Sequence, residues 1–134
     1  MSISLSISTI APWVLRIIAA VIMLQTLYFK FSGSEESVYI FSQLGMEPWG
    51  RMATGILELI ASILILYPKT TFFGSVLAIG LMLGAVGAHL TKLGIEVKND
   101  GGQLFIYGLL VLLSSFILAI IYRIDGINLI KRIL

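Results

Sequence analysis

The stretch TGILELIASILILY, residues 54–67, decides the fold, because it is apolar enough for a lipid bilayer yet carries the carboxylate of Glu58. An ionisable side chain inside a bilayer costs about 2.5–3.5 kcal/mol on insertion scales, so it needs a partner, a proton or a function. The whole chain has 134 residues, of which 58% are hydrophobic and 12% charged, and its mean hydropathy is +1.03. Soluble domains carry about 25% charged residues. We therefore predict an integral membrane protein.

The apolar residues outside this stretch fall into further runs of similar length. A membrane-spanning helix needs about 20 mostly apolar residues. Neither of the longest polar connections is long enough to bury a core of its own. We predict an all-α transmembrane four-helix bundle that forms one domain over residues 1–134, with short loops. The predicted spans are residues 11–29, 51–67, 71–90 and 104–122.

The connection over residues 31–50 has an apolar centre, VYIF at residues 38–41, and a turn signal, EPWG at residues 47–50. These features predict a short interfacial helix or a re-entrant segment between the first two spans. An ordinary interfacial loop is the alternative.

The distribution of positive charge gives a weak indication of orientation. An even number of spans places both termini on one side of the membrane, which carries five lysine and arginine residues against four on the other side. The cationic tail KRIL, residues 131–134, and Lys69 in the short second loop favour cytoplasmic termini. We therefore predict that both ends face the cytoplasm.

Composition also excludes several classes of function. The chain has no cysteine, so disulfides and thiol catalysis are ruled out. Its basic residues are scattered rather than clustered, so we expect no nucleic-acid partner. No catalytic template is present, and one histidine without a thiolate does not make a metal site. We expect no catalytic residues, no bound metal and no catalytic activity of the chain's own.

The polar residues of the predicted spans collect in one half of the membrane. Gln25 lies about 7 Å below Lys30, Glu58 lies about 10 Å below Arg51, and His89 lies about 4 Å below the level of Lys92, at 1.5 Å per residue. Polar residues gathered at similar depth below one end of the bundle indicate a pocket that opens at that end. The residues that we predict to form this ligand-binding or buried polar cluster are Glu58, Lys30, His89, Arg51, Gln25 and Asp100.

Glu58 belongs to a polar stripe on one face of the second span, and this stripe must face the bundle interior. Three states of Glu58 remain open: it pairs with Lys30 or Arg51, it is protonated and neutral, or it bonds to His89. Asp100 has two readings, as part of a turn before the fourth span or as a partner of Lys98 or His89. Members of the stripe are Arg51, Thr54, Gly55, Glu58 and Ser62.

Two features of the other spans concern packing. The third span presents small residues on one face at Gly80, Gly84 and Gly87, and we predict that these glycines allow close helix packing. Arg16 lies about 21 Å from Lys30 along the first helix and cannot join the polar cluster. We expect Arg16 to reach the opposite headgroups or to pair locally.

Several short motifs follow one another in order over nearly the whole chain. They are Arg16, FKFSG at 29–33, LGMEPW at 44–49, GILEL at 55–59, a small-residue third span that ends in His89, and NDGG at 99–102. In these motifs the chain resembles the DoxX family and its DoxX-like relatives, which are small bacterial membrane proteins with four predicted helices.

This resemblance implies location in the bacterial inner membrane and an accessory role in redox or stress chemistry, because the family is named after small subunits of archaeal sulfur-oxidising, quinone-linked complexes. The absence of cysteine excludes sulfur handling by the chain's own thiols. The resemblance carries Lys30, Glu58, His89 and Asp100 over as candidate functional positions. Similar four-helix proteins bind sterol-like or other apolar ligands, or assist assembly of membrane proteins.

Three hypotheses follow. In the first, the polar pocket binds a quinone-like or lipid-like molecule, and the protein supports a membrane redox complex whose subunits are its partners. In the second, the protein is an assembly or scaffold protein for a membrane complex. In the third, it is a small proton-coupled transporter, for which four spans would need a homo-oligomer. Contact with the lipid bilayer is common to all three.

Overall fold

The computed structural model describes residues 7–134, and the regular structure in this part of the chain is helical. Four of its helices are long and apolar enough to cross a membrane, which confirms the predicted all-α class. Each covers one predicted span to within a few residues, except that the first extends further at its start and the third continues into an extra turn. The four are α1, Ile7–Ser32; α3, Trp49–Leu66; α4, Thr71–Ala88; and α5, Gln103–Ile121.

The short helix expected between the first two spans is present as α2, Glu35–Gln43. Its start follows from local chemistry, because the Ser34 hydroxyl accepts a hydrogen bond from the Ser37 amide at 3.2 Å. Gly33 and Gly45 flank the helix with φ angles of +67° and +70°, which a residue with a side chain adopts only at a cost. These two glycines turn the chain sharply on either side of α2.

The remaining elements are short. A 3-10 turn, η1 (Pro68–Thr70), joins α3 to α4, and a π-helical turn, η2 (His89–Leu93), extends α4 beyond the predicted span. A further helix, α6 (Arg123–Ile133), follows α5 and was not predicted. It packs beside η1 and the start of α4, with Gly126 against the ring of Phe72.

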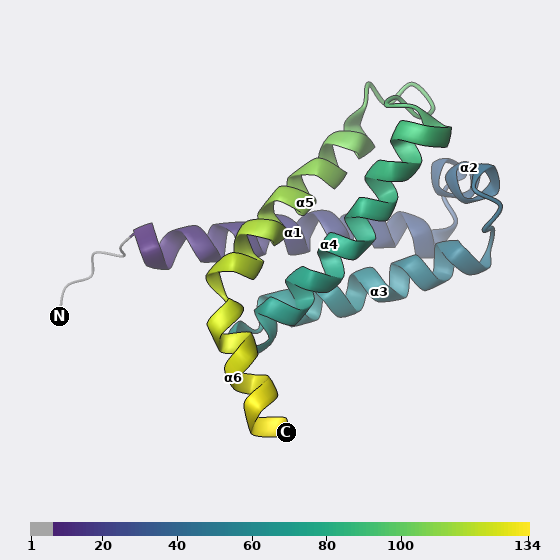
Figure 1. Cartoon of the computed structure of the whole chain (residues 1–134). Helices are drawn as coiled ribbons and strands as arrows, with labels where there is room; N and C mark the ends of the chain where they lie inside the picture. Colours follow the sequence, from purple (N-terminus) through teal and green to yellow (C-terminus); the bar gives the residue numbers. More distant parts are fainter. Residues whose placement is uncertain (1–6) are drawn as a thin grey trace.

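The core lies where α1 and α4 each pack between α3 and α5. Helix α4 packs closely against α3 at Gly74, where an added Cβ would lie 2.7 Å from the Ile65 amide nitrogen and 2.8 Å from the Ala61 carbonyl oxygen. In Figure 1 the pair α4 and α5 diverges from the pair α1 and α3 toward the end of the bundle where α2 lies. The core side chains are Ala19, Met23, Ala61, Ile65, Ala78, Met82, Val111 and Leu118.

Arg16 lies at the opposite end of the bundle and is 1% exposed, so it does not reach out to headgroups. Its Nε donates to the Ile65 carbonyl at 2.8 Å, and its Nη2 donates to the Leu66 carbonyl. The guanidinium also lies 3.7 Å from the centre of the Trp13 ring. Because the last carbonyls of a helix lack partners within it and carry partial negative charge, Arg16 caps the end of α3. Local pairing, one of the two outcomes expected for Arg16, is therefore correct.

Candidate functional site

A cavity of about 370 Å³ occupies the α2 end of the bundle. Side chains of α1, α2, α4 and α5 form most of its wall, and α3 contributes Thr54 and Glu58. Its apolar wall includes Ile22, Met23, Phe41, Leu81, Met82 and Val111, and its polar groups include Thr26, Lys30, Glu36, Glu58 and His89. The cavity therefore combines a largely apolar wall with a few polar groups, which is the usual form of a small-molecule site.

Lys30 and Glu58 form an ion pair in the wall of this cavity. The Lys30 Nζ lies 2.8 Å from Glu58 Oε1, and the two side chains are 16% and 2% exposed. The other carboxylate oxygen, Oε2, accepts a hydrogen bond of 2.6 Å from the Thr26 hydroxyl. Both oxygens of the buried carboxylate thus have partners, which a charge at this depth requires. Of the states left open by the sequence, the structure has the pair with Lys30.

Thr26 was missed by the sequence analysis. It precedes Lys30 by four residues on α1, so the two side chains lie on the same helix face, and this spacing was the available signal. The polar stripe of α3 does face the bundle: Gly55, Glu58 and Ser62 are buried. Gly55 packs against the Phe31 ring of α1, from which an added Cβ would lie 2.6 Å.

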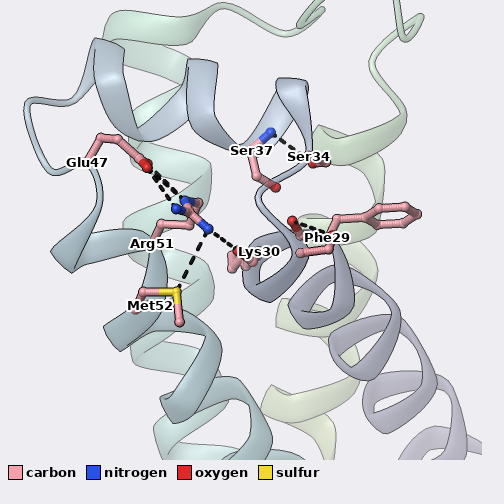
Figure 2. A network of polar contacts seen from close by, with 8 residues as sticks. Phe29, Lys30, Ser34, Ser37, Glu47, Arg51 and Met52 are labelled. Carbon is pink, nitrogen blue, oxygen red and sulfur yellow. Dashed lines mark hydrogen bonds and ion pairs between the residues drawn. The ribbon is translucent and has the colours of Figure 1, made fainter.

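Arg51 belongs to a different network, in which it contacts Glu47 and the carbonyl oxygen of Lys30 (Figure 2). Its Nε lies 3.0 Å from both carboxylate oxygens of Glu47, and its Nη2 lies 2.9 Å from Glu47 Oε1. Its Nη1 donates to the carbonyl oxygen of Lys30, so Arg51 ties the start of α3 to the end of α1. Arg51, which was one possible partner of Glu58, therefore pairs with Glu47 instead. Arg51 does not line the cavity.

His89 is buried and lines the cavity, but its hydrogen bond does not go to Glu58. Its Nδ1 lies 2.9 Å from the Gly94 carbonyl oxygen. A carbonyl oxygen only accepts, so Nδ1 carries a proton in this contact. The ring packs edge-on against Phe105 with centroids 5.6 Å apart. These contacts join His89, the first residue of η2, to Gly94 after that turn and to Phe105 of α5.

Asp100 organises the loop between η2 and α5 and does not line the cavity. Its carboxylate accepts hydrogen bonds from the amides of Val97 at 3.0 Å, Gly102 at 2.8 Å and Leu104 at 3.2 Å. Burial raises the pKa of Asp100, but these amide bonds and the nearby His89 outweigh burial, so its pKa is lowered. The turn reading of Asp100 is therefore the one that the structure has.

Gln25 is exposed and lies outside the main cavity. It lines a second pocket of about 260 Å³, which shares Thr26 and Glu36 with the main cavity. The predicted cluster therefore divides: Lys30, Glu58 and His89 share the cavity, whereas Arg51, Asp100 and Gln25 lie around it.

The glycines of α4 differ in their surroundings. An added Cβ at Gly80, Gly84 or Gly87 would meet no atom within 4 Å, whereas Gly74 is tightly packed. Gly80 and Gly84 line the cavity. Their predicted role in close helix packing stays a prediction, and within this chain the first two leave open space beside the cavity.

Comparison with known proteins identifies one family. The model of the DoxX-like family matches residues 14–117, a segment that includes α2 and each of the predicted site residues. No curated protein and no solved structure gives a match. The matched segment covers well over half of the chain and contains the four candidate membrane spans almost completely. The chain therefore belongs to the DoxX-like family of membrane proteins.

Proposed function

We propose that this protein is an accessory membrane protein that binds a quinone-like or lipid-like molecule in the cavity between α1, α2, α4 and α5. The observation that carries the proposal is the cavity itself, about 370 Å³ of mostly apolar space with a buried ion pair in its wall. Its volume falls within the range of about 300–1,000 Å³ that is usual for small-molecule sites.

The ion pair supports a ligand with a polar end. The Lys30 ammonium has three N–H donors, and Glu58 uses one of them. The remaining donors suit a carbonyl or ester oxygen, which quinones and many lipids carry. Lys30 would hold such an oxygen, while Glu58 and Thr26 fix the position of its ammonium. Glu58 thus acts on the ligand through Lys30.

Occlusion of the cavity tests the proposal without disturbing the ion pair. Gly80 and Gly84 line the cavity and have room for a side chain, so Gly80→Leu and Gly84→Leu, singly and together, should fill it without a backbone clash. Gly87→Leu is the matched control, because Gly87 also has open space but does not line the cavity.

Native mass spectrometry of protein released from lipid nanodiscs, with added decylubiquinone or dodecanol as probes, reports the bound molecule. We expect an adduct on the wild type and on Gly87→Leu, and its loss from the double leucine variant. Equal adducts on all variants would place the probe outside the cavity and contradict the proposed function.

A further inference from the structure

A second acidic side chain of the cavity, Glu36 on α2, has no function in the ion pair described above. Glu36 lines both the main cavity and the adjoining smaller pocket. It lies in the first turn of α2, the segment that the turns at Gly33 and Gly45 place at this end of the bundle. The side chain is therefore held at the edge of the same space that Lys30 and Glu58 border.

The carboxylate of Glu36 is incompletely satisfied. Its Oε1 is buried and has no hydrogen-bond partner among the described residues. A buried acceptor without a partner destabilises the folded protein, and a charged acceptor does so more strongly. Burial, and then the charge of nearby Asp100, raise the pKa of Glu36 above its ordinary value. A hydrogen-bond donor beside this oxygen would therefore stabilise Glu36.

The neighbouring charges do not compensate Glu36. Lys30, the cation of the cavity wall, is already paired with Glu58. Lys98, on the loop after η2, lies 3.7 Å from Glu35 and above the ring of Tyr39 at 4.7 Å. Lys30 and Glu58, which both line the cavity, are paired with each other, and Glu36 is in no ion pair among the described residues. A positively charged group at the α2 end of the cavity would supply the partner that Glu36 lacks.

We propose that Glu36 is the head-group site of this cavity and that the ligand is an amphiphile with a protonated amine, which donates a hydrogen bond to the free Glu36 oxygen while its apolar part lies against α1, α4 and α5. This assignment rests on the proposed function, since it assumes that the cavity holds a ligand, and it defines the chemistry of that ligand. An alkylamine is protonated at neutral pH, as a lysine side chain is. The ammonium supplies both the donor and the charge that Glu36 lacks.

Glu35 provides a control of the same residue type at the next position. Its side chain is 90% exposed and faces Lys98, and it does not line the cavity. Glu36→Gln and Glu35→Gln both remove one negative charge from the first turn of α2. Only the first removes the charge at the cavity. Because the free oxygen of Glu36 has no partner to lose, we expect Glu36→Gln to fold and to melt at or above the wild-type temperature.

The test measures the affinity of dodecylamine and dodecanol, two probes with the same chain, by native mass spectrometry in phosphatidylcholine nanodiscs. For the wild type we expect dodecylamine to bind at least about fivefold more tightly than dodecanol, because a charged hydrogen bond is stronger than a neutral one. Glu36→Gln should weaken dodecylamine about tenfold to a hundredfold and leave dodecanol nearly unchanged. Glu35→Gln should bind both probes as the wild type does.

The outcomes separate this inference from the proposed function. If dodecylamine and dodecanol bind equally, and both are lost from the Gly80→Leu/Gly84→Leu variant, the cavity binds ligands but the assignment of Glu36 is wrong. An amine preference that survives Glu36→Gln, or that Glu35→Gln removes equally, also overturns it. Binding that the leucine variant does not reduce refutes both.

The amine can come from a membrane aminolipid or from a free amphiphilic amine, and a second arm distinguishes these sources. Nanodiscs that contain phosphatidylethanolamine should yield a lipid adduct that Glu36→Gln loses if the aminolipid is the ligand. Wild-type protein that binds dodecylamine but shows no phosphatidylethanolamine adduct would point to a free amine. Both results agree with Glu36 as the ammonium site.

Discussion

Replacing Lys30 with methionine should destabilise the protein strongly, because Lys30 supplies the counter-charge for a carboxylate that is 2% exposed. The 2.8 Å ion pair lies at a depth where removing one partner of a buried pair costs about 3–5 kcal/mol. For a chain of this length that loss corresponds to a melting temperature lower by about 10–20 °C. Thermal unfolding of purified protein in detergent, followed by the loss of helical circular dichroism, measures it.

The double variant Lys30→Met/Glu58→Met separates the charge from the packing. Replacing both members of a buried pair by apolar side chains is often neutral, or stabilising by about 1–4 kcal/mol. Thr26 keeps a partner in this variant, because its hydroxyl also lies 3.0 Å from the Met23 carbonyl oxygen. We therefore expect the double variant to melt well above Lys30→Met. If Lys30→Met melts within about 3 °C of the wild type, the argument that Glu58 needs this counter-charge is refuted.

Three further predictions concern other parts of the bundle. Arg16→Ala removes the cap of α3 and should lower the free energy of unfolding by about 3 kcal/mol, because two hydrogen bonds from a charged group are lost. The exposed Arg123→Ala should have little effect, and equal melting of the two variants would contradict the capping role. Gly74→Ala places a Cβ against the α3 backbone and should lower the free energy of unfolding by about 1–3 kcal/mol. Gly80→Ala adds a Cβ in open space and should melt at or above the wild-type temperature. The reverse order of melting would refute the packing argument. The pKa of Asp100 is lowered in the folded protein, so its contribution to the free energy of unfolding is fully present above the ordinary aspartate pKa and is lost as pH falls through the folded pKa. Asp100→Asn should therefore flatten the acid end of the curve of stability against pH. An unchanged curve would refute this.

Much of the fold could be predicted because bilayer spans follow from the length and apolarity of a run of residues alone. The four runs and the helix at VYIF are confirmed, since neither depends on how helices pack. The helix α6 was missed because its sequence, RIDGINLIKRI, mixes isoleucine with charged residues and is too polar to be predicted as a membrane span. The spacing of Ile124, Ile127 and Ile130 is typical of a helix, but only the charges of this segment were used, as an indication of orientation.

The site was predicted less completely, because depth along a helix does not specify which side chains meet. Depth and helix face predicted one polar cluster, of which Lys30, Glu58 and His89 line one cavity in the structure. The partners of the other residues did not follow from depth. Arg51 forms an ion pair with Glu47, four residues before it, and Asp100 accepts hydrogen bonds from amides of its own loop. Bringing local partners such as these together costs the least chain entropy. The local turn was one of the two alternatives for Asp100, whereas Glu47 was not considered as a partner of Arg51. The orientation of the termini and the function of the cluster stay predictions.

The cap that Arg16 places on α3 also bears on how the protein is made. The two carbonyl oxygens that receive its guanidinium belong to residues 49 and 50 positions later in the chain. At about 5–20 residues per second the ribosome needs about 3–10 s to synthesise that distance. During this interval a bilayer would hold α1 with an unpartnered arginine, at a cost of about 2.5–3.5 kcal/mol. We therefore expect α1 to remain beside the translocon, or at the membrane surface, until α3 arrives, so that the first two spans enter the lipid together.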